Sequence, residues 1–250
     1  MPEVAVVFVD VSSDGFVWCL TPNHLLAFDG QHFEDYGALD TTGAAAVPYP
    51  ILFRGWSAEK NGTPWIHGQR GAMWRGPDGW RRLDLTEGYR SILAMPLDIA
   101  GRFWAVTEDG VWRVEQNQLV PVARSTVKIM TAVADPKGGL RIGSTAGLFH
   151  FAGEDFTPVV AGEYGSLDEV VCMERGRTID WIICARQGLI LQKGAEWKRV
   201  PLPFASSQVT RVLEDDAGAI WVGTKQGLYR YADGIWSELS ARDVANPVNV

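Results

Sequence analysis

The fold of this chain is decided by one stretch of sequence, Gly218-Ala219-Ile220-Trp221-Val222-Gly223-Thr224-Lys225-Gln226-Gly227-Leu228-Tyr229-Arg230-Tyr231. Residues 220–224 and 228–231 are rich in the β-branched and aromatic side chains that favour strands, and Gly227 lies in the break between them. Variants of this stretch occur six times along the 250 residues. Strand-like phrases with a period of about 40 residues predict a β-propeller, in which each repeat forms one blade.

Three columns of residues establish the repeat. With Gly227 as the marker position, the other five repeats carry His24, Gly71, Gly110, Gly147 and Gly188 there. Nine residues after the marker every repeat has an apolar residue, namely Phe33, Trp80, Leu119, Phe156, Trp197 and Trp236. Six residues before the marker stand Trp18, Trp65, Trp104, Arg141, Ile182 and Trp221, and in the fifth repeat the tryptophan is displaced by one position to Trp181.

Each repeat has the pattern of four short strands. In the sixth, residues 209–213 form the first strand, 215–218 the turn after it, and the pair Asp233-Gly234 a tight hairpin before Trp236 opens the fourth strand. A sheet with two apolar faces must pack against neighbours, and stacking around a ring provides them. The sequence therefore predicts an all-β fold, a single six-bladed β-propeller with four antiparallel strands per blade, in one domain of residues 1–250. The expected blades cover approximately residues 4–36, 51–84, 91–122, 127–160, 168–201 and 208–239.

The composition excludes some partners. The chain carries 30 acidic and 23 basic residues, a net charge of −7, which argues against nucleic acid because phosphate binding needs a basic surface. No apolar run approaches the ~20 residues that span a bilayer. The start of the chain lacks the pattern of a secretory signal, so we expect a cytoplasmic monomer without a membrane partner, or a periplasmic one if a signal peptide has been removed. The three cysteines, Cys19, Cys172 and Cys184, are expected to be buried free thiols.

The segment from Glu214 to Thr224, followed by Gly227-Leu228-Tyr229-Arg230-Tyr231, resembles the two-component regulator propeller repeat. The fourth copy, from Gly139 to Phe149, is similar to that repeat without its tryptophan. The resemblance implies a propeller of the kind found in the sensor portions of bacterial hybrid two-component systems. It also implies a ligand-sensing or interaction module. The sequence contains no recognisable membrane helix, kinase or DNA-binding region, so direct signalling by this chain is not expected.

Most tryptophans and glycines belong to the repeat, so we interpret them as structural. Tryptophans that recur at fixed positions form the layers between blades, and Gly188 and Gly227 precede strands rather than the helix that a phosphate loop requires. Trp56 on a first strand and Trp74 and Trp112 on third strands are less constrained by the repeat. Of these, Trp56 is the best candidate for stacking on a ligand. The four histidines have no metal-ligand spacing, so neither a metal nor another cofactor is expected.

The candidate site is the mouth of the central channel, where the loops from second to third strands meet the connections between blades. The residues at these loops, together with Trp56, that we expect to bind a ligand are His24, Arg54, Trp56, Arg70, Arg90, Glu108, Lys128, Asp168, Arg186 and Lys225. Arginine suits the bidentate capture of carboxylates, and opposed carboxylates such as Glu108 and Asp168 could share acid–base work. The first repeat interval is longer than the others, and its excess in residues 37–50 is either a lid over the mouth or a tolerated surface insertion.

Three hypotheses for the function remain open. The first is a non-catalytic ligand-binding or sensor-type module that holds a small polar or carbohydrate-like molecule. Such a module should have a polar pocket in which the pKa values of carboxylates or histidines are shifted. The second is a protein–protein interaction scaffold, which should present an exposed apolar patch. The third is a propeller lyase or hydrolase that uses carboxylates or histidines from several blades. No Ser-His-Asp or Cys-His arrangement is readable, which favours a non-catalytic role.

Overall fold

The structure is a computed structural model that describes residues 8–11, 16–21, 24–38, 53–58, 64–68, 71–76, 79–83 and 91–239. The chain divides into two compact units, Met1–Arg124 (unit 1) and Ser125–Val250 (unit 2), and each unit is described by itself. The described residues form strands and two 3₁₀ turns, and none of their helical turns is long and apolar enough to cross a membrane.

Unit 1 contains three four-stranded sheets in which each strand pairs antiparallel with the next along the chain. The first sheet is β1 (Phe8–Val11), β2 (Val17–Leu20), β3 (His24–Phe28) and β4 (Phe33–Ala38). The second is β5 (Phe53–Ala58), β6 (Pro64–Gly68), β7 (Gly71–Gly76) and β8 (Gly79–Leu83). The third is β9 (Ile92–Ala94), β10 (Trp104–Thr107), β11 (Gly110–Glu115) and β12 (Gln118–Arg124).

Unit 2 repeats this arrangement with three further sheets. The first is β13 (Ile129–Ala134), β14 (Leu140–Ser144), β15 (Gly147–Phe151) and β16 (Phe156–Pro158). The second is β17 (Cys172–Glu174), β18 (Trp181–Ala185), β19 (Gly188–Lys193) and β20 (Glu196–Val200). The third is β21 (Val209–Glu214), β22 (Ile220–Thr224), β23 (Leu228–Ala232) and β24 (Ile235–Leu239). The 3₁₀ turns η1 (Gly162–Tyr164) and η2 (Ser206–Gln208) lie in the connections between these sheets.

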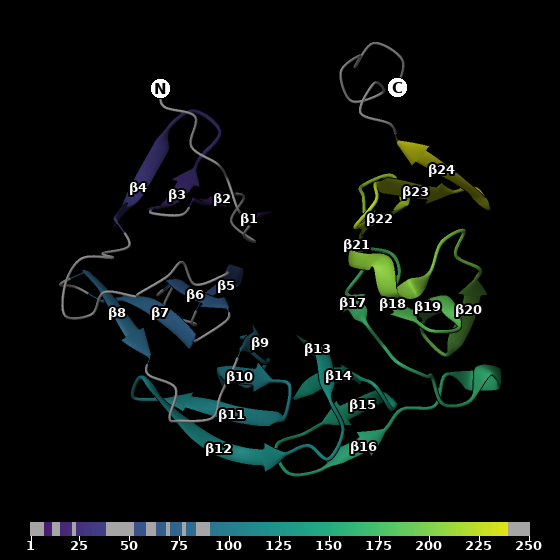
Figure 1. The fold of residues 1–250 in the computed structure, drawn as a ribbon, viewed down its shortest axis with the longest axis horizontal. Helices are drawn as coiled ribbons and strands as arrows, with labels where there is room; N and C mark the ends of the chain where they lie inside the picture. The colour runs from purple at the N-terminus through teal and green to yellow at the C-terminus, as the bar shows by residue number, and fades with distance from the viewer. Residues whose placement is uncertain are drawn as a thin grey trace. The chain divides into compact units, whose positions relative to one another are not determined.

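Within each unit the sheets stack by their first strands, as Figure 1 shows. Strand β5 contacts β1 and β9 in unit 1, and β17 contacts β13 and β21 in unit 2. Stacked four-stranded antiparallel sheets with their first strands adjacent are the architecture of a β-propeller. The fold class is therefore confirmed as an all-β propeller. The number of blades that close one ring and the extent of the domain stay predictions.

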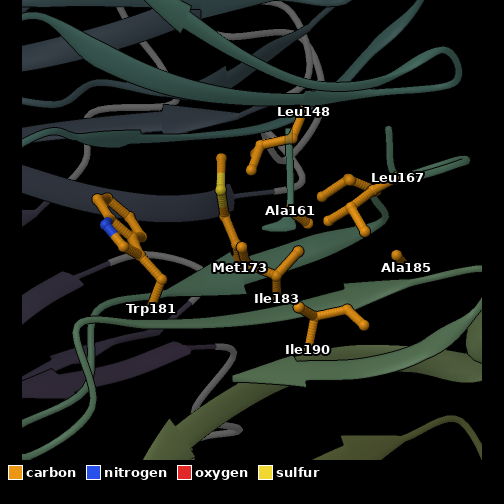
Figure 2. Close-up of a cluster of buried hydrophobic side chains, with 9 residues drawn as sticks. Leu148, Ala161, Leu167, Met173, Trp181, Ile183, Ala185 and Ile190 are labelled. Atoms are coloured by element: carbon orange, nitrogen blue, oxygen red, sulfur yellow. The ribbon is translucent and has the colours of Figure 1, made fainter. Parts of the chain in front are cut away.

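An apolar core fills the space between the first two sheets of unit 2 (Figure 2). Leu148 from β15 faces Met173, Ile183 and Ile190 from the next sheet, and each of these side chains is at most 3% exposed. Burying such side chains stabilises the unit by roughly 2 kcal/mol each relative to exposure. All five residues of the second strand β18 are buried, so this strand is covered on both faces. The strand cannot be stable as part of an isolated sheet.

Two of the marker glycines of unit 2 are required by the backbone. Gly147 and Gly188 have φ angles of 120° and 128°, a region that L side chains rarely adopt. A Cβ on Gly147 would also lie 2.3 Å from the carbonyl oxygen of Leu167. The predicted hairpin at Asp233-Gly234 is confirmed as well, because both residues have positive φ angles, 52° and 84°.

A carboxylate locks the turn between first and second strands to the repeated tryptophan. Asp215 accepts hydrogen bonds at Oδ1 from the backbone N–H groups of Ala217 and Ala219, at 3.0 and 2.8 Å, and at Oδ2 from Trp221 Nε1, at 2.7 Å. Asp98 makes the equivalent bond with Trp104 Nε1 at 2.9 Å. The repeated tryptophans are thus structural, as predicted, and Trp18, Trp65, Trp104 and Trp181 are all at most 8% exposed. Trp112, interpreted from sequence as less constrained, is also buried, at 2% exposed.

The repeat departs from its tryptophan pattern at Arg141, in the fourth repeat, and at Trp181, in the fifth, and these two side chains lie in contact. Arg141 replaces the tryptophan of the fourth repeat, and its Nε donates to Asp135 Oδ2 at 3.2 Å, as the indole nitrogen does elsewhere. Its Nη1 donates to Gln192 Oε1 at 2.7 Å in the next sheet, and its guanidinium lies 4.7 Å from the ring centroid of Trp181. Burial lowers the pKa of Arg141, an effect that Asp135 opposes. The displaced tryptophan of the fifth repeat therefore packs on the arginine of the fourth.

The fifth repeat takes its turn carboxylate from the following sheet. Glu214 on β21 accepts hydrogen bonds at Oε2 from the backbone N–H groups of Arg177, Thr178 and Ile179, at 2.5, 2.9 and 3.2 Å, and at Oε1 from the Thr178 hydroxyl. Burial of Glu214 raises its pKa, but these hydrogen bonds outweigh burial and leave the pKa lowered. Glu214 consequently joins the last two sheets of unit 2.

The cysteines are free thiols, as predicted. Cys184 is buried, whereas Cys19 and Cys172 are half-buried. Burial raises the pKa of Cys172 to about 11 and that of Cys184 to about 12. Both thiols of unit 2 are therefore protonated and unreactive near neutral pH.

Replacing Arg141 should reveal its pairing with Asp135. We expect Arg141→Met to lower the free energy of unfolding by about 3 kcal/mol, because it leaves the carboxylate of Asp135 buried without its cation. Chemical denaturation measures this loss. The double variant Arg141→Met/Asp135→Asn should lose less than the sum of the two single variants. Additive losses would show that the two side chains do not interact.

Glu214 should make the stability of the chain depend on acid. Because its folded-state pKa lies below the unfolded value, its contribution is fully present above the unfolded pKa and is lost as the pH falls through the folded pKa. Glu214→Gln should therefore lower stability at pH 7 and flatten the decline of Tm between about pH 5 and pH 2. Glu196→Gln, an exposed change on β20, is the control and should alter neither. An acid profile unchanged in Glu214→Gln would refute this role.

Candidate functional site

The candidate site of unit 2 lies at the end of the sheets where the loops from second to third strands meet the connections between blades. In each of the three sheets, one backbone hydrogen bond ties these two segments together. The bonds run from Thr145 N to Lys128 O at 2.9 Å, from Arg186 N to Asp168 O at 3.0 Å, and from Lys225 N to Gln208 O at 3.0 Å. Four predicted site residues thus lie at this end of the sheets. Lys128 and Asp168 occupy equivalent places in the connections between blades, and Arg186 and Lys225 occupy equivalent places in the loops.

Adjacent sheets are linked at this same end. The N–H of Val170, which precedes β17, donates to the carbonyl of Ser144 at the end of β14, at 2.9 Å. The connection from the first to the second sheet therefore runs directly beside the loop of the first. We refer to the surface formed by Lys128, Asp168, Glu169, Arg186, Gln187, Gln208 and Lys225 as the unit-2 rim.

An ion pair lies at the centre of the unit-2 rim. Arg186 donates to Glu169 Oε2 from Nη2 at 2.9 Å and from Nε at 3.2 Å. The side chain of Arg186 is 68% exposed and that of Glu169 33% exposed, so the pair is open to solvent. Such a pair stabilises the fold by at most about 1 kcal/mol. Both bonds come from one edge of the guanidinium, which fixes its direction.

Glu169 adopts a left-handed backbone conformation, with φ 41°. Among the described residues, three other non-glycine residues have positive φ, and all lie in tight hairpin turns: Gln116, Asn117 and Asp233. Glu169 instead lies in the connection before β17. A left-handed residue other than glycine costs roughly 1–2 kcal/mol, and such strain concentrates at functional sites. The backbone is held in this form by the Val170 and Arg186 bonds on either side of it.

Gln187 holds the connection before β17 that contains Asp168 and Glu169. Its Oε1 accepts a hydrogen bond from the backbone N–H of Asp168 at 3.1 Å. This bond holds the backbone of Asp168, an exposed residue, beside the loop that contains Arg186. Neither Glu169 nor Gln187 is among the site residues predicted from the sequence. Their proximity to Asp168 and Arg186 in sequence was the available signal.

The predicted residues of unit 1 are only partly described. Glu108 is half-buried in the turn between β10 and β11, and His24 is half-buried at the start of β3. Arg54 and Trp56 lie on β5, but their side chains are outside the description, and Arg70 and Arg90 lie outside the described residues altogether. Most of the 37–50 segment also lies outside them, so its interpretation as a lid stays a prediction.

The carboxyl groups of unit 2 whose pKa values are shifted lie away from the unit-2 rim. The pKa values of Glu214 and Asp215 are lowered, and both residues hold turns between first and second strands, at the opposite end of the sheets. For Asp215 the main cause is the hydrogen bond from Trp221. Within the described ranges, no group of three or more His, Cys, Asp or Glu side chains is arranged to hold a metal ion. The rim is thus a surface of mixed charge suited to hydrogen bonding and ion pairing.

One family profile matches the chain, that of the two component regulator propeller, over residues 203–226. The resemblance expected from sequence is therefore confirmed for the sixth repeat. No curated protein gives a significant match. The matched segment covers η2, β21 and β22, which includes Gln208 and ends just after Lys225 on the unit-2 rim.

Solved structures with the same fold belong to proteins of different kinds. Virginiamycin B lyase from Staphylococcus aureus is 11% identical with a TM-score of 0.68, covering 94% of this chain and 83% of the lyase. An extracellular domain of a hybrid two component system from B. thetaiotaomicron is 15% identical with a TM-score of 0.68, covering 97% of this chain and 34% of that one. A chain of the mitotic checkpoint complex is 9% identical with a TM-score of 0.62, covering 96% and 81%. The present chain thus spans about a third of that extracellular domain, and these similarities support the propeller fold.

The backbone at Glu169 can be tested by two substitutions. Glu169→Asn should change the free energy of unfolding by less than about 0.5 kcal/mol, because asparagine tolerates the left-handed region and the lost ion pair is exposed. Glu169→Val should destabilise by about 1–2 kcal/mol, since a β-branched residue fits that region poorly. Chemical denaturation of both variants measures the difference. Equal stabilities would contradict the left-handed assignment.

Proposed function

We propose that this chain is a sensor-type β-propeller module that binds a small polar or carbohydrate-like ligand at the loop-lined mouth of its channel. In unit 2 the ligand would contact the unit-2 rim. The observation that carries the proposal is the Arg186–Glu169 pair, which is solvent-exposed and held by a left-handed backbone. An exposed ion pair contributes little to stability, so strain there is better explained by a recognition role.

The chemistry of the rim suits an oxygen-rich ligand. Arg186 and Lys225 supply donors, Asp168 supplies acceptors, and Gln208 can supply both. Small-ligand sites combine a few convergent polar groups of this kind with a scaffold of rigid strands. The match of residues 203–226 to the two component regulator propeller family supports a sensor role. The similarity to an extracellular sensor domain also favours the periplasmic alternative for its location.

The module is proposed to be a single ring of six blades. Six copies of the repeat in the sequence support this number. A protein-interaction scaffold is the competing function, since propellers also serve in protein assemblies. Exposed apolar side chains in unit 2, such as Val160 at 60% and Ile235 at 69%, are its best support. Val160 lies in the connection after β16 and Ile235 on β24, and single exposed apolar residues are normal on a protein surface.

A thermal-shift screen against neutral sugars, sugar acids and nucleotides tests the proposal. We expect at least one compound to raise the Tm, because a ligand at 100 times its Kd adds about 2.7 kcal/mol to the stability of the folded state. Arg186→Gln should then lower the affinity for that compound by about 10-fold or more, which is the contribution of a hydrogen bond to a charged group. Lys198→Gln, an exposed change on the outer strand β20, is the matched control and should leave binding unchanged.

Two outcomes would count against the small-ligand function. If no compound in the three classes shifts the Tm, the scaffold becomes the better account. If a compound binds but Arg186→Gln and Lys198→Gln behave alike, the ligand site lies elsewhere than the unit-2 rim.

A further inference from the structure

His24 and Asp35 form a close pair in the first sheet of unit 1. The Nδ1 atom of His24 lies 2.9 Å from Oδ2 and 3.2 Å from Oδ1 of Asp35. The side chains are 41% and 50% exposed, so both can be reached by a small molecule. Neither the proposed ligand site of unit 2 nor the packing of the sheet makes use of this pair.

The local strand geometry brings the two side chains together. Leu26 on β3 pairs with Asp35 on β4, whereas His24 pairs with Ala38, so the register shifts by one residue between them. His24 and Leu26 project from the same face of their strand, which makes His24 a diagonal neighbour of Asp35. Bulges of this kind redirect side chains and are common beside functional sites.

The repeat itself marks His24 as exceptional. It occupies the position that is glycine in the other five repeats. In unit 2 a Cβ at the corresponding Gly147 would meet the backbone of the next connection at 2.3 Å. At the corresponding Gly227, by contrast, a Cβ would meet no atom closer than 3.6 Å, so the position can accept a side chain in some repeats. His24 itself lies at the register shift between β3 and β4.

The hydrogen bond determines which ring nitrogen is available. A carboxylate accepts but cannot donate, so the neutral ring of His24 must carry its proton on Nδ1 and its lone pair on Nε2. The carboxylate also faces the ring that becomes cationic when Nε2 takes up a proton. This is the orientation that a carboxylate gives to a histidine base in hydrolytic triads.

The other two exposed or half-buried histidines differ. His32 is 81% exposed, and its Nδ1 lies 3.9 Å from Asp29 Oδ2, too far for a hydrogen bond. His150 engages its Nε2 with the carbonyl of Gly138 at 2.8 Å. Only His24, of these three, combines a hydrogen-bonded Nδ1 with an Nε2 that no described contact occupies.

We propose that His24, positioned by Asp35, is a general base that activates water toward small carboxylic esters, an activity beyond the proposed binding function. Nε2 takes a proton from water as the water oxygen forms a bond to the ester carbonyl carbon. The bond from that carbon to the alcohol oxygen then breaks, and the proton on Nε2 passes to the departing alkoxide. The products are the carboxylic acid and the alcohol, and no oxidant, metal or cofactor takes part.

Hydrolysis of 4-nitrophenyl acetate by the full chain tests the activity. His24→Gln should lower kcat/KM by about 100-fold, the usual contribution of a positioned acid or base. His32→Gln removes a more exposed imidazole that lacks the close carboxylate and should leave the rate unchanged. A rate in His24→Gln equal to that of the wild type would overturn the proposal, as would an equal fall in His32→Gln. Circular dichroism melts of each variant show whether it is folded.

The positioning role of Asp35 has its own readout. Long-range ¹⁵N–¹H NMR spectra should show His24 as the Nδ1–H tautomer in the wild type and a mixture of tautomers in Asp35→Asn, whose amide can also donate. Asp35→Asn should lower kcat/KM by about 10-fold or more while His24 keeps its place. A His24 ring with its proton on Nε2 in the wild type would overturn the proposal, because that nitrogen could not then act as the base.

Discussion

The rest of the structure depends on one constraint, that the second strands of three described sheets are buried on both faces and must be covered by neighbouring sheets. All residues of β6, β14 and β18, the second strands of three sheets, are buried. Burial on this scale is the main favourable term in folding, and a single sheet could not achieve it. Stacking leaves the loops at the sheet ends as the surfaces free to vary. The proposed recognition surface lies in those loops.

A second interaction, the hydrogen bonding of a carboxylate at the turn between first and second strands, is retained in altered form where the sequence departs from the repeat. In the regular repeats an aspartate holds the turn and the indole N–H, as Asp215 and Asp98 do. Where tryptophan is replaced by Arg141, the guanidinium takes over the bond to Asp135. Where the fifth repeat lacks the aspartate, Glu214 reaches across from the next sheet. In the third to sixth sheets the same end is thus fixed by a carboxylate, and in unit 2 the opposite end carries the rim.

The periodic part of the sequence was sufficient to predict the strands, because hydrophobic spacing and turn glycines act locally. Strand β22 was predicted at its observed limits, and the Asp233-Gly234 hairpin was correct. The burial of Trp112 was missed because the cluster that covers it combines residues of its own repeat with Trp65, Ala72 and Leu83 of the preceding sheet. The rim loops were predicted from topology, but the ion pair of Arg186 with Glu169 was not. That pairing depends on the left-handed backbone at Glu169, which no residue type in the loop indicates.

Hydrogen–deuterium exchange tests the central claim, that the unit-2 rim is the recognition surface. The chain would be compared with and without the compound that stabilises it most in the ligand screen. The account predicts slower exchange in residues 166–170 and 185–188, and no change in 196–200 on the outer strand. Protection of the outer strand, or of the turns at the opposite end of the sheets, with no change at the rim would contradict the account.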